Sequence, residues 1–526
     1  MGDTQPDEHK SPTPFVREST GLVKNVSFLD SISLNLSNMS IGGLLGGLGI
    51  NLFAVGFVFV SLAGVNLIAA SILGFLLSVP QIVLYTMMTR RYPRTGGDYV
   101  WVSRNLGGFF GSSISFMGYT METTAYMALV TILAVFAIGG VGLALGHFEY
   151  LGLALPTNIG GDPNQQFAVG AALFAILVAI NIFRPKFGYK LVSYLTIIGI
   201  VVLLITIGTL LSAGHSGVVN YINSLQTASG ASISFDSVAA SYTGSSFDWG
   251  ATLFIMPVMF AFVYPWLNAA PAVASEIKGS RALKWNVPIS AVVALILTTS
   301  AIATMYYVAG QPFINAMMSN SDLTFYNGIN FFTLAMGVAP NSAVALVIGL
   351  GWIAWVVAIL AYGIIVISRY LLSQSFDRFL PARLAYVSPK WGSPVVAHAV
   401  DLVFTITLIG LATYFYGTVS SLFGAITGSM IYFIFVGIAA MVHAMRKETG
   451  NAKWLLTAAG LGNVIVFAYV TWEFVSNYST WGINLLSGGF NVFSLILGAS
   501  LYLGARQYLR RRGLDISMAY KELPPE

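Results

Sequence analysis

Residues 256–271 read MPVMFAFVYPWLNAAP, an apolar segment that three prolines interrupt. Each proline removes a backbone donor, and its ring clashes with the preceding turn, so a continuous helix through Pro257, Pro265 and Pro271 is unfavourable. Within a membrane, freed backbone groups are tolerated where they face the protein interior or a cavity. The stretch therefore predicts a membrane-spanning helix that is broken near its middle.

The composition of the whole chain is that of a helical membrane protein. Of its 526 residues, 56% are hydrophobic and 9% are charged, whereas soluble domains are about a quarter charged. Apolar runs of about 20 residues suit membrane helices, since barrel strands alternate and need only about 10 residues. The sequence therefore predicts an all-α integral membrane protein.

The basic residues predict the topology. All 25 Lys and Arg fall in seven clusters, and the stretch between neighbouring clusters is long enough to cross the membrane twice. Because positive charge is retained in the cytosol, the pattern predicts twelve transmembrane helices with both termini cytosolic, in the plasma membrane. The expected spans are 39–62, 65–89, 108–143, 166–184, 189–213, 249–274, 286–310, 341–372, 395–415, 417–443, 454–476 and 485–508.

A second interruption is expected in the first span, where residues 41–50 read IGGLLGGLGI. Each glycine costs a helix about 1 kcal/mol relative to alanine. Such a run either lets helices pack closely in lipid or breaks the helix and turns freed N–H groups toward a ligand. Paired breaks in corresponding helices are typical of a transporter's midplane site. A half-helix N-terminus attracts an anionic group and freed carbonyls attract a cation, so an amino acid fits such a site.

Four stretches carry further motifs. They are GLGI at 47–50, YPRTGGDY at 92–99 with RNLG at 104–107, FAF at 260–262 with SEIKGSR at 275–281, and Arg369 with DRFLP at 377–381 and GSP at 392–394. Their order and spacing resemble the amino acid–polyamine–organocation (APC) superfamily of secondary transporters. The loop that contains Gly96 and Gly97 is the most specific of them.

The resemblance implies a five-plus-five inverted-repeat fold with helices 1 and 6 discontinuous, two extra C-terminal helices and alternating access. The two repeats show no clear sequence similarity to each other. The corresponding divisions are a cytosolic tail over 1–30, a first repeat over 31–213, a second repeat from 214 that runs through the ninth span to 415, span ten with the extra helices over 416–508, and a cytosolic tail over 509–526.

The resemblance also implies a substrate site at the two breaks. The N–H groups that would receive a substrate carboxylate are those of Gly46, Gly47, Leu48 and Gly49. The carbonyls that would hold the amino group lie near Ala261, Phe262 and Tyr264. The candidates for an aromatic gate are Phe262, Tyr264 and Trp266. The alternative is that these aromatic side chains only pack against the core or lipid.

The chain departs from the family pattern at positions that bear on substrate size and coupling. Residues 264–266 read YPW where the family usually has G-[FY]-[DE], so the side-chain pocket is expected to be reshaped. Gly199 stands where several members carry a membrane-embedded lysine. Residues 348–367 contain no Ser or Thr to supply a sodium ligand. We therefore favour proton coupling or exchange over sodium coupling.

Glu122 lies midway along the third expected span. An acid inside a span is costly enough to suggest a function, here proton coupling or contact with a cationic substrate. The alternative is a structural acid that is hydrogen-bonded to nearby hydroxyl groups. Asp401 and His398 share a helical face and suggest a hydrogen-bonded pair near the cytosolic end of their span, or a gating role. Glu473 and His443 lie near the ends of their spans, where polar residues are ordinary.

These features predict a transporter and not an enzyme. The sequence contains no phosphate-binding loop, hydrolase elbow or metal-ligand spacing, so we expect neither catalytic residues nor a cofactor or metal. The first hypothesis is a secondary active transporter of neutral amino acids, with protons as the possible coupling ion and membrane lipid but no nucleic acid as a partner. The alternatives are a polyamine or organic cation permease and an amino acid sensor that retains the fold.

Overall fold

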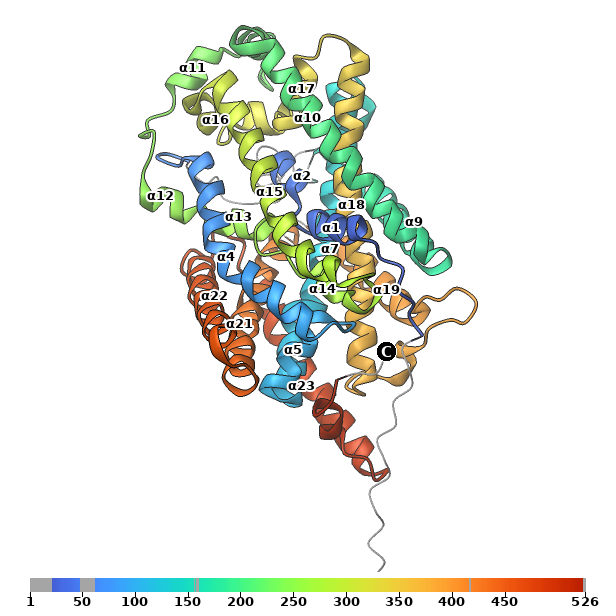
Figure 1. Ribbon diagram of the computed structural model, residues 1–526. Coiled ribbons are helices and arrows are strands. Elements are labelled where there is room, and N and C mark those ends of the chain that lie inside the picture. Colours follow the sequence, from blue (N-terminus) through green and yellow to red (C-terminus); the bar gives the residue numbers. More distant parts are fainter. Residues whose placement is uncertain (1–20, 48–61, 156, 158–159, 416–417, 524–526) are drawn as a thin grey trace, which may run out of the picture.

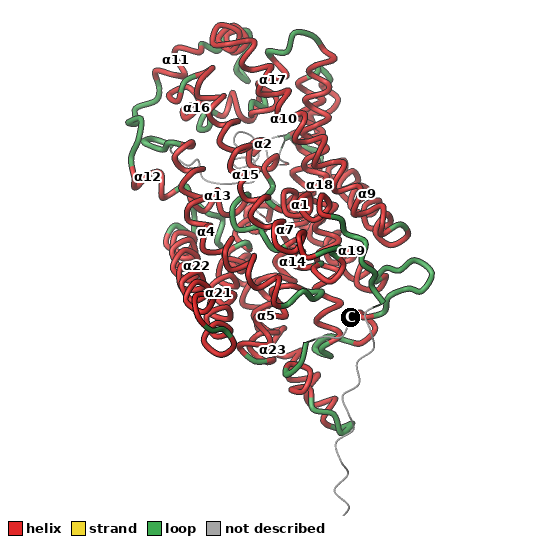
Figure 2. Tube along the Cα trace, in the orientation of Figure 1, coloured by secondary structure: helices red, strands yellow, loops and turns green. Residues whose placement is uncertain are grey.

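The computed structural model describes residues 21–47, 62–155, 157, 160–415 and 418–523. Over these residues the chain is built from helices (Figures 1 and 2) and three isolated β-bridges. Ten stretches of helix are long and apolar enough to cross a membrane, so the chain is a helical multi-pass membrane protein. They are α4 (Leu67–Arg91), α6 to α7 (Gly108–Ala144), α9 (Pro163–Phe183), α10 (Pro185–Asn223), α15 (Ser280–Ala309), α18 (Ser342–Phe376), α19 (Val395–Tyr414), α20 to α21 (Ser420–Lys447), α22 (Gly450–Ser476) and α23 (Leu485–Arg510).

The first predicted span begins earlier than the hydropathy suggests. Helix α1 (Phe28–Asn38) starts at a capping box formed by Ser27 and Asp30, which satisfies the first backbone donors. The helix is then interrupted at Met39 and Ser40, where Ser40 has a left-handed φ of 29°. Helix α2 (Ile41–Gly46) follows. This interruption lies upstream of the glycine run in which a break was predicted.

The sixth predicted span is divided into short helices. Helices α12 (Trp249–Phe254) and α13 (Met256–Phe262) are followed by an irregular segment that contains Pro265, and the chain becomes helical again in α14 (Ala269–Ala272). The interruption therefore lies at the proline-rich stretch that predicted it. Helix α1 contacts α10, α14, α15 and α18, which brings the two interrupted spans together inside the bundle (Figure 1).

Two buried ion pairs join the segments on the side of the bundle that carries most of the basic residues. Arg369 of α18 binds Glu276 through its Nε at 2.9 Å, and both side chains are less than 5% exposed. The hydroxyl of Tyr189 donates to Glu276 at 2.9 Å and accepts from Arg369 at 3.0 Å. Arg104 of α5 (Gly97–Leu106) forms the second pair with Asp377. The motif stretches that contain Arg104 and Glu276 are thereby tied to the motif that begins at Arg369, near the end of α18.

Replacing Arg369 by Met should destabilise the protein by about 3–5 kcal/mol, because it leaves the Glu276 carboxylate buried without its partner. The double variant Arg369→Met, Glu276→Gln removes both charges and should recover a large part of this loss. Thermal unfolding of the purified protein in detergent measures both effects. Equal stability of the single and double variants would show that packing, and not the unpaired charge, causes the loss.

Candidate functional site

Three buried asparagines join the two interrupted spans. Asn38 of α1 donates from Nδ2 to Oδ1 of Asn268 at 2.9 Å. Asn35 accepts a hydrogen bond from the backbone N–H of Ala270 at 2.9 Å and donates to Asn286 of α15 at 3.1 Å. Because an unsatisfied backbone group in a membrane costs several kcal/mol, Asn35 stabilises the break by pairing a donor that the helix has lost.

An aromatic pair lies between the same two breaks. The hydroxyl groups of Ser40 and Tyr126 are 2.8 Å apart, which connects the break in the first span to α7. The rings of Tyr126 and Trp266 stack with their centroids 5.4 Å apart and an interplanar angle of 15°. Trp266 Nε1 donates to the carbonyl of Ala261 at 2.8 Å, across the break in the sixth span. This carbonyl, one of those predicted to hold a substrate amino group, therefore already has a donor.

The other aromatic candidates lie on opposite sides of the break. Phe262 faces the first span, since a Cβ atom on Gly43 would lie 3.6 Å from its ring, and it packs on Phe423. Tyr264 points away toward α4, where its hydroxyl lies 2.7 Å from that of Ser71. The structure thus brings Phe262 and Trp266 to the region between the spans and places Tyr264 in the packing against α4.

The described glycines of the first span pack against tryptophans of α18. A Cβ atom on Gly46 would lie 2.3 Å from Nε1 of Trp352, and one on Gly42 would lie 2.6 Å from Cγ of Trp355. Gly47 has helical backbone angles. For Gly42 and Gly46 the geometry fits the close-packing interpretation. Leu48 and Gly49, two of the residues predicted to bind a carboxylate, lie outside the described residues.

Trp355 also fills the space beside Gly199. A Cβ atom on Gly199 would lie 2.4 Å from Cε3 of the indole. One buried ring therefore contacts both α2 and α10 from α18. The room that a lysine at position 199 would need is occupied by this ring, and sequence reasoning gave no sign of it because the three residues are far apart in the chain.

Glu122 is fully buried at the start of α7, directly after a π-helical turn, η2 (Phe116–Met121). Its Oε2 lies 2.6 Å from the hydroxyl oxygen of Ser429 on α21 (Thr427–Lys447). The same hydroxyl oxygen lies 2.7 Å from the carbonyl of Gly118. Oε1 of Glu122 has no hydrogen-bond partner among the described residues.

The proton count at this contact fits a neutral acid. A serine hydroxyl has one proton, and a backbone carbonyl only accepts. If Ser429 donates to Gly118, its contact with Glu122 needs a proton on the carboxyl group. If Ser429 donates to a carboxylate instead, the Gly118 carbonyl loses this donor. Only the protonated acid satisfies both contacts, so the geometry around Glu122 distinguishes its two protonation states.

Asp98 is a functional candidate that sequence reasoning missed. It lies in α5, is fully buried, and accepts hydrogen bonds from Tyr85 at 2.5 Å and from Tyr370. Burial raises the pKa of the Asp98 carboxyl, although the hydrogen bonds from Tyr370 and Tyr85 oppose this effect. Asn268 reaches the same carboxyl at 3.4 Å, which connects Asp98 to the broken sixth span. The only sequence signal was an acid within the GGDY motif.

The remaining ionisable candidates occupy separate places. The predicted pair of His398 and Asp401 is wrong: Asp401 accepts from Thr405 at 3.0 Å, and the ring nitrogens of His398 have no hydrogen-bond partner within the described chain. The carboxyl of Glu473 accepts from Asn477 at 3.1 Å. His443 lies 2.8 Å from the hydroxyl of Tyr92 and 3.2 Å from the carboxyl of Glu448.

Arg91 and Glu448 form an ion pair at the C-terminal end of α21, and Glu448 lies outside the membrane-spanning segments. Arg91 binds Glu448 beyond the last turn of α21 and lowers the pKa of that carboxyl to about 2, chiefly through the hydrogen bond between them. None of these groups contacts the two breaks directly.

Comparison with known proteins establishes the family. The family model described as amino acid permease matches residues 27–501, so the chain belongs to this family, within the APC superfamily. Uncharacterized transporters of Mycobacterium bovis and of Mycobacterium tuberculosis strain H37Rv are each 22% identical over 468 residues, which cover 85% of this chain and 86% of theirs. An uncharacterized protein of Sulfolobus islandicus rod-shaped virus 1 is 33% identical over 86 residues, 16% of this chain. The match spans only 20% of that viral protein. The chain is therefore a transporter of the APC type and not an enzyme.

Two glycines of α10 provide a matched test of the packing around Trp355. Gly199→Ala should destabilise the protein by about 1–3 kcal/mol, because its methyl group overlaps the indole. Gly208→Ala places its methyl group in open space and should stabilise the helix by up to about 1 kcal/mol. The thermal unfolding midpoints of the two purified variants check this difference. Indistinguishable midpoints would contradict the contact between Gly199 and Trp355.

Proposed function

We propose that this member of the amino acid permease family is a proton-coupled transporter of neutral amino acids that works by alternating access. The observation that carries the proposal is the pair of contacts that Ser429 makes with Glu122 and with the Gly118 carbonyl, which a protonated acid satisfies together and a carboxylate does not. We further propose twelve spans in the plasma membrane, two inverted five-helix repeats with two extra helices, and cytosolic termini.

The position of Glu122 supports a coupling role. Glu122 and Tyr126 are one turn apart on α7 and therefore share a helix face. Tyr126 in turn contacts Ser40 and stacks on Trp266, at the two breaks. A change in the charge of Glu122 thus acts one helical turn away from the residues that separate the two interrupted spans. This proximity gives a physical route from proton binding to the substrate region.

The side chains between the breaks support a neutral substrate. The described groups there are amides, hydroxyls and aromatic rings, with Asn38, Ser40, Tyr126 and Trp266 as the central ones. Such a set holds an uncharged side chain by packing and hydrogen bonding. The charged ends of the amino acid are assigned to the backbone, with Leu48 and Gly49 on the carboxylate side and Ala261 and Phe262 on the amino side. Gly46 and Gly47 were predicted on the carboxylate side, but Gly46 packs on Trp352 and the N–H of Gly47 donates to the carbonyls of Gly43 and Leu44.

The packing of α18 supports a driving ion other than sodium. A sodium site of the kind that related folds have would need oxygen ligands on α18 opposite the first span. That face of α18 carries Trp352 and Trp355, whose rings lie against Gly46 and Gly42. A bulky indole supplies no oxygen, so the position is better suited to packing than to cation binding.

Uptake into proteoliposomes tests the proposal. With a pool of labelled amino acids and no sodium, an inward proton gradient should drive accumulation, and subdivision of the pool identifies the substrate. Glu122→Gln should abolish gradient-driven accumulation, because Gln cannot release a proton, while counterflow exchange of the substrate persists. Glu473→Gln is the control, since Glu473 is an acid near the end of α22 whose carboxyl accepts from Asn477.

Four outcomes would overturn parts of this proposal. Uptake that needs preloaded amino acid and ignores the gradient would make the protein an exchanger and Glu122 a structural acid. Uptake that requires sodium would contradict the role given to Trp355. Transport of polyamines alone would indicate that Glu122 binds a cationic substrate, and absence of any transport would favour a sensor.

A further inference from the structure

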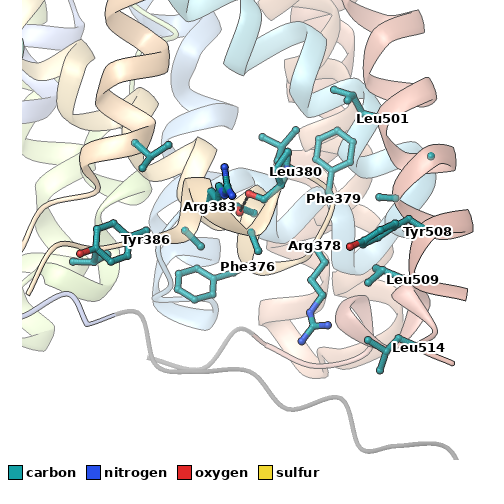
Figure 3. Close-up of a pocket in the computed structure, with 18 of the residues that line it drawn as sticks. Phe376, Arg378, Phe379, Leu380, Arg383, Tyr386, Leu501, Tyr508, Leu509 and Leu514 are labelled. Atoms are coloured by element: carbon teal, nitrogen blue, oxygen red, sulfur yellow. Dashed lines mark hydrogen bonds between the residues drawn. The ribbon is translucent and has the colours of Figure 1, made fainter. Parts of the chain in front are cut away.

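A large cavity lies away from the two breaks, between the loop that follows α18 and the C-terminal part of α23 (Figure 3). Its volume is about 1720 Å³, which exceeds the ~300–1,000 Å³ of typical small-molecule pockets. The proposed transport mechanism does not account for it, although its loop wall is formed in part by residues 378–381 of the DRFLP motif. The cavity has an apolar wall along α23 and basic residues at its other end, so it suits an elongated ligand that has an apolar part and an anionic part.

One wall of the cavity is an apolar stripe along α23. Leu497, Leu501, Ala505 and Tyr508 line it, and their spacing of four, four and three residues places them on one helix face. From Leu497 to Leu509 the stripe is about 18 Å long at 1.5 Å per residue. One leaflet of a bilayer has a hydrocarbon thickness of about 15 Å, half of the ~30 Å core. The stripe therefore matches the length of a lipid chain within one leaflet.

The opposite wall is rigid and preformed. Phe379 and Leu380 are 1% and 6% exposed and belong to a cluster with Phe116 of η2 and Tyr502 of α23. The loop is fixed by a hydrogen bond from the Ser375 hydroxyl to the carbonyl of Pro381 at 2.6 Å. The apolar wall is thus held in place by the protein itself and needs no ligand to form.

The other end of the cavity is basic. Arg378 and Arg512 line this end, whereas Arg383 lines the cavity beside Leu380, and none of the described lining residues is acidic. In Figure 3, Arg378 extends away from Leu501 and Phe379, toward the end marked by Leu514. The guanidinium group of Arg512 lies over the ring of Tyr508, 4.4 Å from its centroid. Arginine is suited to phosphate because its planar group donates two parallel hydrogen bonds.

We propose that this cavity binds an anionic phospholipid, with its phosphate group at Arg378 and Arg512 and an acyl chain along the stripe of α23. The positive charge of the arginines favours an anionic headgroup. The length of the apolar stripe on α23 favours a lipid over a soluble phosphate. Exposed apolar side chains of α23 next to the stripe, Ile496 and Leu503, are 59% and 51% exposed and continue the cavity into a lipid-facing surface. The proposal does not depend on the substrate or the coupling ion of the transporter.

Binding of phosphatidylglycerol to the full-length protein in nanodiscs of phosphatidylcholine tests the headgroup site. Native mass spectrometry or a fluorescent lipid analogue reports the affinity. Arg378→Gln and Arg512→Gln should each weaken binding about fivefold, as expected for the loss of one basic residue at a membrane surface. Arg511→Gln is the matched control, since Arg511 is adjacent in sequence but does not line the cavity. Equal weakening of lipid binding by all three variants would show that only the general surface charge matters, and it would contradict a specific headgroup site.

A second pair of variants tests the acyl part. Gly504 lines the cavity, and a Cβ atom there meets nothing within 4 Å, so Gly504→Trp fills the space without a clash. Gly489→Trp on the same helix also enters open space but lies outside the cavity. Only Gly504→Trp should displace the lipid, by tenfold or more. Unchanged binding in Gly504→Trp, equal affinity for phosphatidylcholine, or competition by millimolar inorganic phosphate would each contradict a phospholipid site.

Discussion

The structure depends on one constraint: inside a membrane, every backbone donor and acceptor must find a partner within the protein. Two of the spans are broken, and each break removes helical hydrogen bonds. Side chains replace some of them. Asn35 of the first span accepts from the freed N–H of Ala270, and within the sixth span the indole of Trp266 donates to the carbonyl of Ala261. The break in the sixth span therefore depends on the first span for one of its backbone partners.

The same constraint makes the breaks suitable for transport. A net hydrogen bond contributes only about 0.5–1.5 kcal/mol, so a substrate that offers a carboxylate and an ammonium group replaces such links at little cost. The surrounding contacts are much firmer. The ion pair of Arg369 with Glu276 and the indole of Trp355 between α2 and α10 are buried and closely packed. A few weak polar links enclosed by rigid packing suit the alternating access that we propose.

Much of the fold was readable from sequence, because membranes impose simple rules. Pro265 and its neighbouring prolines marked the broken sixth span, and the apolar runs marked the ten long helices. The break at Ser40 was missed, since no proline precedes it and the glycine run drew attention downstream. Asp98 and Trp355 were also missed. Their roles come from residues far away in the chain, Tyr370 in one case and Gly199 in the other, and no local pattern reveals such contacts.

The basic residues that predict orientation also have individual environments. Counted together, they are a topological signal, but Arg369 is buried in an ion pair, whereas Arg378, Arg383 and Arg512 line one cavity. A topological signal needs only charge on the correct side of the membrane, in any arrangement. Arg378 and Arg512 at one end of an apolar groove, with a rigid aromatic wall opposite, are a more specific arrangement than orientation demands. Membrane topology does not require the arginines to line a shared cavity. Their placement there is the physical reason to assign them a ligand.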